Sequence, residues 1–369
     1  MPRSKKSFNA LFAAGGTGGH LFPAMAVAER LRDIFKNDFH AEFVGTANRI
    51  ESKAVPNAGY DFSPMPIAGF KGIFSISTLT LPFKIRRSIS ICRKLIKEKS
   101  IDMVLCTGAY ISYPAGVAAQ KENIPLVLME SNLTPGKAIR MLSDRADLII
   151  TAFAGSRIYY PEQLHSKIKP LGNPVRQSII DLPAKEDGIK TFGLDPAKNT
   201  ILIFGGSLGA RSINDAAEIL IKELDPEKFQ FIWQTGKHYH DKMEKMENLR
   251  QLKFIDDMAS AYSAADLIIS RSGATTTSEI CISGKPSILV PFPAASNNEQ
   301  ELNARHLQEN AAAILMYEET LSDDIVKIVE DLFRTEKDLK AMAEAAKSLA
   351  KPNATNDAAQ AVIDLVDKL

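Results

Sequence analysis

The stretch from Asn9 to Ala24, NALFAAGGTGGHLFPA, decides the fold of the first half of the chain. Its apolar start is typical of a buried strand, and we interpret it so rather than as part of a cleavable signal. A glycine-rich turn follows, and Pro23 suits the first turn of the next helix, where its missing N–H costs no hydrogen bond. Four residues then share one helical face: Ala24, Ala28, Leu31 and Phe35. The order strand, glycine turn, helix indicates a Rossmann-like unit.

The same pattern returns in the second half of the chain. Ile201 to Phe204 leads into GGSLGA, as Leu11 to Ala14 leads into GGTGGH. Elsewhere short β-rich runs alternate with amphipathic helical stretches, as expected for parallel sheets covered on both faces. The sequence therefore predicts an α/β fold with two Rossmann-like domains facing across a cleft. A single continuous sheet would contradict this architecture.

The element pattern also gives domain boundaries. The segment from Leu182 to Asn199, with two prolines and mixed charges, is interpreted as a linker. We place the domains at residues 1–182 and 183–350, with a C-terminal helix at 351–369 for which packing back on the N-terminal domain is one option. The expected strands are Asn9–Ala14, Ala41–Val44, Met103–Cys106, Leu126–Met129, Leu148–Thr151, Ile201–Phe204, Phe229–Gln234, Leu267–Ser270 and Ser287–Val290.

Composition excludes several classes of function. Lys plus Arg total 45 and Asp plus Glu total 44, so no basic field predicts a nucleic-acid partner. Cys92, Cys106 and Cys281 are too far apart to indicate a disulfide framework or a zinc site, which fits a reducing compartment. His238 and His240 fit a solvated helix face better than a ligand pair, and we expect no cofactor. No run of about 18 apolar residues occurs, so a soluble or peripheral protein is expected.

The two glycine loops are candidate diphosphate sites. Glycines allow a ligand to approach the backbone closely, and amide N–H groups at a helix start favour negative charge. The alternative is that each loop only makes a tight turn between strand and helix. Neither loop matches the dinucleotide fingerprint GxGxxG or the GK[ST] ending of a P-loop, which disfavours hydride transfer and ATP hydrolysis.

Seven motifs follow one another along the chain: GGTGGHLFPA, TGAYISYP, ESN, GNPVR, GGSLGAR, FIDDM and SRSGATTTSE. In this order they resemble the MurG family of peptidoglycan N-acetylglucosaminyltransferases over nearly the whole chain. The resemblance implies a glycosyltransferase B fold that needs no metal. It also implies inverting transfer of N-acetylglucosamine from UDP-N-acetylglucosamine to the C4 hydroxyl of the N-acetylmuramoyl group of lipid I, giving lipid II. The acceptor would bind mainly to the N-terminal domain and the donor to the C-terminal one.

The resemblance also assigns the donor site. Glu279 would accept hydrogen bonds from both ribose hydroxyls, although an acid at a helix start also interacts with the helix dipole. Ser207 and its loop would hold the α-phosphate, and the backbone of Ile255 would meet uracil. For Arg176 a surface salt bridge is the alternative. The other donor-binding candidates are Thr17, Gly18, Gly19, Asn132, Ala274, Thr275, Thr276, Thr277, Ser278 and Gln300.

His20 is the candidate catalytic residue. Inversion needs one base to take the proton of the acceptor hydroxyl, and a histidine with an ordinary pKa of about 6.5 suits that role. A hydrogen bond to the acceptor diphosphate is an equally good role for His20. Tyr110, in the second motif, is assigned to the acceptor side.

The segment from Gly69 to Lys97 is apolar in its first half and basic in its second. Ile85, Ile89, Cys92 and Ile96 mark a helical face that can pack on the first sheet. The candidates for acceptor or membrane contact are Phe70, Ile73, Phe74, Leu79, Phe83, Arg86 and Arg87. Such a patch suits an anionic membrane surface. The resemblance implies a peripheral enzyme on the cytoplasmic face of the bacterial membrane, with a cell-wall synthesis complex as a further partner.

Two departures and two rivals remain. Ala109 and Tyr113 stand where the family usually has glycine and a small residue, and Glu299 stands where it has histidine or glutamine, which leaves a sugar contact at Glu299 open. A UDP-N-acetylglucosamine 2-epimerase would share the fold and the nucleotide, but would not need the apolar and basic patch. A nucleotide-sugar-binding regulator without catalysis is the rival of another class.

Overall fold

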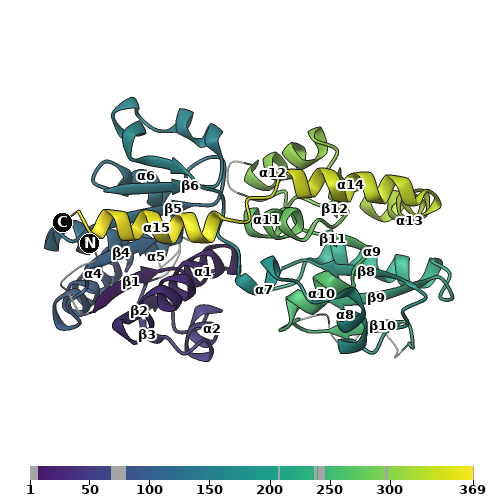
Figure 1. The fold of residues 1–369 in the computed structure, drawn as a ribbon, viewed down its shortest axis with the longest axis horizontal. Coiled ribbons are helices and arrows are strands. Elements are labelled where there is room, and N and C mark those ends of the chain that lie inside the picture. The colour runs from purple at the N-terminus through teal and green to yellow at the C-terminus, as the bar shows by residue number, and fades with distance from the viewer. Residues whose placement is uncertain are drawn as a thin grey trace. The chain divides into compact units, whose positions relative to one another are not determined.

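The chain forms two compact units in a computed structural model that describes residues 7–67, 80–206, 208–236, 239, 246–295 and 298–368. One unit runs to Arg176 and takes in the segment from Asn353 onward, and the other is Gln177–Pro352 (Figure 1). The boundary therefore lies before the expected position at residue 182. The physical reason is that α7 (Gln177–Ile180) packs on helices α10 and α11 of the second unit.

The first unit contains a parallel sheet of seven strands in the order β3-β2-β1-β4-β5-β6-β7. The strands are Phe8–Ala13 (β1), Phe39–Gly45 (β2), Asp61–Pro64 (β3), Met103–Cys106 (β4), Leu126–Glu130 (β5), Leu148–Thr151 (β6) and Ile168–Pro170 (β7). The α-helices are Gly18–Phe35 (α1), Glu51–Asn57 (α2), Leu81–Glu98 (α4), Ala109–Glu122 (α5), Lys137–Ser143 (α6) and Ala354–Val366 (α15). The described part of the unit also contains three 3-10 helices: Lys36–Asp38, Ala154–Tyr159 and Glu162–Lys167.

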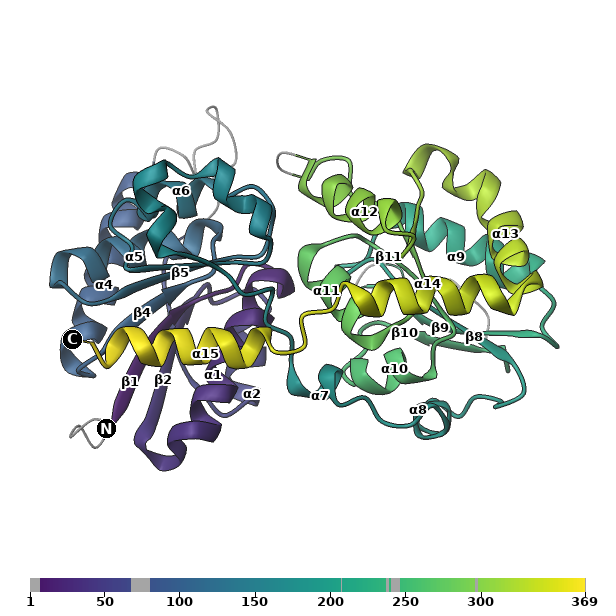
Figure 2. The same ribbon diagram turned by 45° about the horizontal axis from the view of Figure 1, so that its top comes forward.

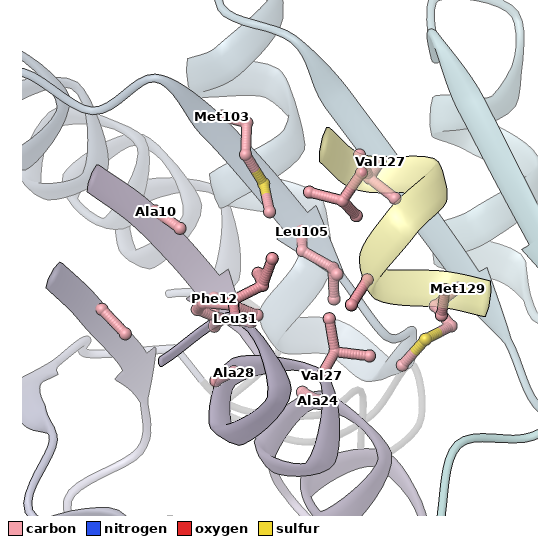
Figure 3. Close-up of a cluster of buried hydrophobic side chains, with 14 of the residues drawn as sticks. Ala10, Phe12, Ala24, Val27, Ala28, Leu31, Met103, Leu105, Val127 and Met129 are labelled. Atoms are coloured by element: carbon pink, nitrogen blue, oxygen red, sulfur yellow. The ribbon is translucent and has the colours of Figure 1, made fainter. Parts of the chain in front are cut away.

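Apolar side chains form a core on each face of this sheet. Helices α1 and α15 pack side by side on one face, where Phe12, Leu105 and Val127 meet residues of both helices (Figures 2 and 3). Helices α4 and α5 cover the other face, around Leu11, Val104 and Cys92. The last helix thus belongs to the first unit although it is last in the sequence. Burial on this scale contributes about 25 cal/mol per Å² of apolar surface.

Helix α1 begins earlier than its sequence indicates. The carbonyl of Thr17 accepts from the amides of His20 and Leu21, so that Gly18 and Gly19 form the first turn. Pro23 therefore lies in the second turn and not in the first. The glycine loop is consequently shorter, and its last two glycines belong to the helix start.

The second unit has a parallel sheet of six strands in the order β10-β9-β8-β11-β12-β13. The strands are Asn199–Phe204 (β8), Phe229–Gln234 (β9), Leu249–Leu252 (β10), Leu267–Ser270 (β11), Ser287–Leu289 (β12) and Ile314–Leu315 (β13). The helices beyond α7 are Lys185–Thr191 (α8), Arg211–Glu223 (α9), Met258–Ala264 (α10), Ala274–Ser283 (α11), Glu299–Glu309 (α12), Glu318–Arg334 (α13) and Glu336–Ser348 (α14). Helices α9 and α13 share a core with the buried Trp233.

Two separate parallel sheets confirm the predicted α/β class with two Rossmann-like units. In the first unit β1, the strand before the glycine loop, lies between β2 and β4. In the second unit β8 lies in the same way between β9 and β11. All nine expected strands are present; four have the expected bounds, and the ends of the other five differ by at most two residues. Four strands were missed: β3, β7, β10 and β13. They are the edge strands of the two sheets and are largely not buried, so they lack the apolar runs that mark the buried strands.

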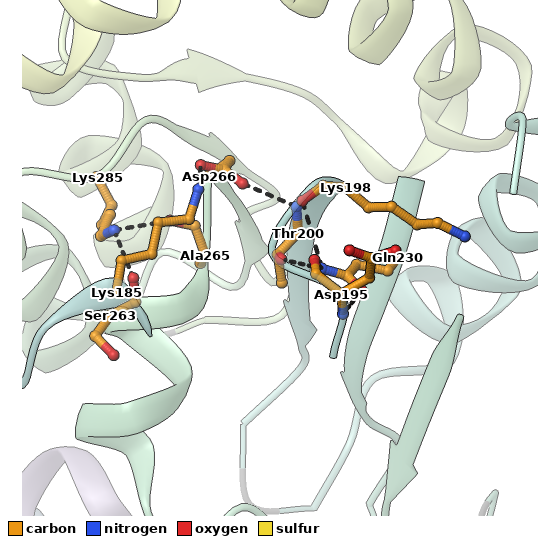
Figure 4. Close-up of polar contacts among 9 residues, drawn as sticks. All are labelled: Lys185, Asp195, Lys198, Thr200, Gln230, Ser263, Ala265, Asp266 and Lys285. Atoms are coloured by element: carbon orange, nitrogen blue, oxygen red, sulfur yellow. Dashed lines mark hydrogen bonds and ion pairs between the residues drawn. The ribbon is translucent and has the colours of Figure 1, made fainter. Parts of the chain in front are cut away.

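The interpretation of residues 182–199 as a linker is wrong, because the segment contains α8. Gly188 and Ile189 are buried, and α8 packs on α10. The ammonium of Lys185 also pairs with Asp266 at 2.5 Å (Figure 4). Burial lowers the pKa of the neighbouring Lys285 to about 8. The Nζ of Lys285 donates to the backbone carbonyls of Ser263 and Ala265, at the C-terminal end of α10.

The loop after α8 is held by a buried amide. Gln230 on β9 accepts from the backbone N–H of Asp195 at 2.9 Å and donates to the Asp195 carbonyl at 2.7 Å. Its Nε2 also donates to the Thr200 hydroxyl (Figure 4). The segment that joins the units in sequence is therefore packed against the second one. Among the described helices, none is long and apolar enough to cross a membrane.

We predict that Gly188→Ala destabilises the second unit by about 1–3 kcal/mol, because the new methyl group overpacks the α8–α10 contact. A Cβ at this position would lie 2.2 Å from the Ser263 hydroxyl and 2.5 Å from the Ser260 carbonyl. Trp233, the one tryptophan of the chain, is buried in this unit, so its fluorescence during urea unfolding measures the change. Gly273→Ala is the control, since open space surrounds that position and its φ is −62°. Equal midpoints for both variants would contradict the prediction.

Candidate functional site

The first glycine loop lies at the carboxyl edge of the first sheet, between β1 and α1. Gly15 and Gly16 have φ values of +152° and +82°, and only glycine adopts the second without strain. A Cβ on Gly16 would lie 3.8 Å from the ring of Tyr110, which places this tyrosine of the second motif beside the loop. Thr17 is exposed at the N-cap of α1. The structure thus brings together the predicted residues Thr17, Gly18, Gly19, His20 and Tyr110.

His20 is fixed by the end of a neighbouring strand. Its Nδ1 lies 2.7 Å from the carbonyl oxygen of Thr107, just after β4. Because a carbonyl only accepts, Nδ1 carries the proton, and Nε2 of the neutral ring has a lone pair that can accept one. Burial lowers the pKa of His20 below its usual 6.5, and the bond to Thr107 opposes that shift only in part. The neutral form therefore dominates at pH 7.

Two glutamates that our sequence reading did not select hold the loops of this edge. Glu51, at the start of α2, accepts from the amide of Gly16 at 2.9 Å. Glu130, at the end of β5, accepts from the amides of Asn132 at 2.9 Å and Gly136 at 2.8 Å. Both carboxylates are buried. The predicted Asn132 is therefore placed by its neighbour in the ESN motif.

Arg176 lies against the start of α1. Its guanidinium is 4.6 Å from the centre of the Phe22 ring, a cation–π distance. The residue before it, Val175, exchanges two hydrogen bonds with the hydroxyl of Thr355 in the first turn of α15. The conformation of the GNPVR motif therefore depends on the returning C-terminal helix, and Arg176 belongs to the first unit.

In the second unit, one side chain joins two candidate donor contacts. Gln234, at the end of β9, donates from Nε2 to the carbonyl of Gly206 in the second glycine loop at 2.9 Å. Its Oε1 accepts from the amide of Ile255 at 2.8 Å. The amide of Ile255 is thus engaged, and its carbonyl is the backbone group left for a base. Ser207, predicted at the phosphate, lies outside the described residues.

Glu279 is buried on α11, the helix that follows β11. Its Oε2 accepts from the hydroxyl of Tyr262 at 3.0 Å, and Tyr262 is itself fully buried on α10. The first turn of α11 contains the predicted residues Ala274 to Thr277. The hydroxyl of Ser278 donates to the carbonyl of Ala274 at 2.8 Å. A helix start and an oriented carboxylate therefore lie on one element, as an anion and a diol require.

Arg271 organises the loops around this helix. Its guanidinium donates to the carbonyls of Val290 and Pro291 after β12, and it pairs with Glu318 at the start of α13. Gln300 on α12 accepts from the amide of Phe292 at 3.0 Å, so its oxygen is used internally. Sequence reasoning missed Arg271, although it stands inside the SRSGATTTSE motif.

The residues that depart from the family pattern have distinct environments. Ala109 has a φ of +54°, in the left-handed region that favours glycine. Tyr113, on α5, is partly buried and packs against the core that α4 and α5 cover. Glu299 is partly buried at the start of α12, and burial raises the pKa of its carboxyl. A partly buried acid therefore stands where the resemblance implies histidine or glutamine, and the contact at Glu299 stays open.

Helix α4 carries the described part of the apolar and basic patch. Phe83 is 73% exposed, and Arg86 and Arg87 are exposed beside it. Cys92 and Ile96 are buried and the isoleucines of the predicted face pack against the core. The other predicted contacts, Phe70, Ile73, Phe74 and Leu79, lie outside the described residues. In the described parts of the chain no group of three or more histidine, cysteine or acidic residues could hold a metal ion.

Comparison with known proteins identifies what this arrangement is similar to. The model of the glycosyltransferase family 28 N-terminal domain matches residues 10–151, and that of the family 28 C-terminal domain matches residues 200–361. A relative from Christiangramia forsetii is 37% identical over 370 residues, which cover 99% of this chain and 98% of the relative. That relative is named UDP-N-acetylglucosamine--N-acetylmuramyl-(pentapeptide) pyrophosphoryl-undecaprenol N-acetylglucosamine transferase.

Solved structures agree with this match. The crystal structure of Acinetobacter baumannii MurG superimposes with a TM-score of 0.70 at 29% identity, covering 98% of this chain and 100% of the other. The UDP-N-acetylglucosamine 2-epimerase of Neisseria meningitidis, bound to UDP-N-acetylglucosamine, gives a TM-score of 0.67 at 15% identity, covering 97% and 100%. The second likeness shows a shared fold alone.

Proposed function

Because the chain belongs to glycosyltransferase family 28, we propose that it is a hexosyltransferase with the activity named for its full-length relatives. It moves N-acetylglucosamine from UDP-N-acetylglucosamine to the C4 hydroxyl of the N-acetylmuramoyl group of lipid I, and so produces lipid II for peptidoglycan. The observation that carries the proposal is 37% identity over 99% of this chain to a transferase of that name. The resemblance drawn from the seven motifs points to the same family.

The donor is bound by the second unit in this proposal. Glu279 accepts from the ribose hydroxyls, and its second contact, the Tyr262 hydroxyl, fixes the plane of the carboxylate. The first turn of α11 and the second glycine loop, with Ser207, present amides to the diphosphate. When the anomeric C–O bond breaks, charge grows on the UDP oxygen, and amides at a helix start stabilise that charge. No step requires a metal ion.

The acceptor is bound by the first unit, and His20 takes its proton. Nε2 of the neutral ring accepts the proton of the C4 hydroxyl as the new bond to the anomeric carbon forms. The hydrogen bond from Nδ1 to Thr107 then stabilises the imidazolium. Thr17, Gly18, Gly19, Asn132, Arg176 and Gln300 are the remaining candidates for contacts with the donor sugar and diphosphate, and Tyr110 for the acceptor.

The place of action is the cytoplasmic face of the cell membrane, where lipid I is embedded. The exposed Phe83 and the adjacent arginines of α4 support this location, because an apolar side chain beside cations suits anionic headgroups. Association with a cell-wall synthesis complex is part of the same proposal.

The decisive test is whether label from UDP-N-acetylglucosamine appears in an extractable lipid when lipid I is supplied. We predict transfer by the wild type, and a rise in KM for the donor of roughly 10- to 100-fold in Glu279→Gln, because a hydrogen bond to a charged group contributes about 1.5–3 kcal/mol. Glu344→Gln, an exposed acid on α14, is the control and should match the wild type. Conversion of UDP-N-acetylglucosamine to its 2-epimer without lipid would favour the epimerase, and binding without turnover would favour the regulator.

The pH profile tests the base. Since the neutral ring is the active form and burial lowers the pKa of His20 below its usual 6.5, we predict that the acid limb of kcat/KM lies at a lower pH than that usual value. His20→Gln retains a donor for the Thr107 carbonyl but cannot take a proton. It should lower kcat by about 10²- to 10⁴-fold and remove the acid limb. Unchanged turnover at saturating lipid I, with a raised KM for lipid I, would instead assign His20 to the acceptor diphosphate.

Vesicle flotation tests the membrane surface. We predict that the double variant Arg86→Gln/Arg87→Gln lowers the partition constant for anionic vesicles, obtained from recovery at several lipid concentrations, by roughly 30-fold, at about 1 kcal/mol for each charge near the surface. Lys337→Gln/Lys340→Gln on α14 removes the same charge from the second unit and should float like the wild type. Equal recovery with and without anionic lipid would overturn this part of the proposal.

A further inference from the structure

A fully buried carboxylate lies beneath the first glycine loop. Glu51 is the first residue of α2 and has no exposed surface. Its Oε2 accepts from the amide of Gly16 at 2.9 Å, and its Oε1 accepts from the amide and the hydroxyl of Thr46 at 2.9 and 2.7 Å. The side chain therefore joins the loop after β1 to the residue after β2. Nothing in the motif resemblance assigns a role to it.

Two glycines make room for this carboxylate. A Cβ on Gly15 would lie 2.5 Å from Cδ of Glu51, and a Cβ on Gly45 would lie 2.5 Å from its Cγ. Real side chains do not approach so closely, so neither position accepts alanine without a shift of Glu51. The first glycine of the loop therefore serves an internal contact, in addition to any approach by a ligand.

The contact sets the shape of the loop. No basic side chain among the described residues forms an ion pair with Glu51, so hydrogen bonds from Gly16 and Thr46 are what compensate its burial. A buried acceptor that loses its partner bears the full cost of its desolvation, and that cost is greater when the acceptor is charged. Displacement of Gly16 is therefore costly. Thr17, the N-cap of α1, follows directly, and His20 lies in the first turn.

We propose that Glu51 is a positioning residue for the transfer reaction. By holding the Gly16 amide it fixes the start of α1, and through it the place of His20 and of the helix amides that meet the acceptor. The inference rests on the proposed function, since it concerns the same site. A purely structural role, in which Glu51 only stabilises the first unit, is the alternative.

Glu51→Gln tests the proposal with little change of shape. Glutamine offers one acceptor oxygen in place of two, so it can serve the two donors of Thr46 while its NH₂ group faces the Gly16 amide. We expect kcat to fall by roughly 10- to 100-fold while KM for UDP-N-acetylglucosamine changes by less than about twofold, because loss of one charged hydrogen bond is worth about 1.5–3 kcal/mol. Glu51→Asp keeps the charge but is one methylene shorter, and should lose a similar factor.

Glu42→Gln is the matched control. Glu42 is also a buried glutamate of this unit, 3% exposed on β2, but it pairs with Lys99 and lies away from the loop. Both variants are expected to lower thermal stability, and only the Glu51 variants to lower kcat in the fraction that remains folded. Equal kcat in Glu51→Gln and Glu42→Gln would mean that Glu51 only stabilises the first unit, and it would overturn the proposal.

Hydrogen exchange gives a readout that does not depend on activity. In Glu51→Gln, peptides that cover residues 14–19 should exchange at least about tenfold faster, while peptides from β1 and β4 keep their protection. Wild-type protein without transfer activity would refute the proposed function and leave this measurement valid. Unchanged exchange in the loop would refute the positioning role even if transfer is observed.

Discussion

The candidate site depends on side-chain acceptors that hold backbone amides at the carboxyl edges of the two sheets. Loops that follow parallel strands have few partners of their own, so their shape must come from elsewhere. Glu51 and Glu130 supply it in the first unit by accepting from Gly16, Asn132 and Gly136. In the second unit the amide of Gln234 joins Gly206 to Ile255. Glycine allows these loops many backbone conformations, and hydrogen bonds to the buried acceptors then select one of them.

Such preorganisation matters for transfer between two substrates that both carry a diphosphate. A loop that rearranged at each turnover would lose much of the free energy that its amides provide to the transition state. The histidine follows the same logic. Its tautomer is set by the Thr107 carbonyl, and its neutral state by burial, before any substrate binds. The hydrogen bonds and burial that prepare His20 for the proposed chemistry therefore exist without a ligand.

The sequence predicted the parts of this arrangement that are repeated or periodic. Strand, glycine loop and helix recur in both halves, and the long apolar strands stand out from their surroundings. It failed where tertiary contacts outweigh local pattern. Helix α8 exists because Gly188 lets it approach α10, and Lys185 pairs with Asp266. Glu51 and Gln234 resemble ordinary polar residues in sequence, since only the fold shows that each is buried beside a backbone amide.

Ala109, in the turn between β4 and α5, has a strained backbone conformation. An alanine at a φ of +54° costs roughly 1–2 kcal/mol, which glycine would avoid. The conformation persists because its neighbours overdetermine it. Gly108 has a φ of +98° and its amide donates to the Ser112 hydroxyl at 2.9 Å, while that hydroxyl lies 3.3 Å from the carbonyl of Ala13 at the end of β1. A Cβ on Gly108 would come within 3.3 Å of the His20 ring, so this turn lies directly against the histidine. Strain at Ala109 is thus maintained by the hydrogen bonds that Ser112 makes with Gly108 and Ala13, in the turn that packs against His20.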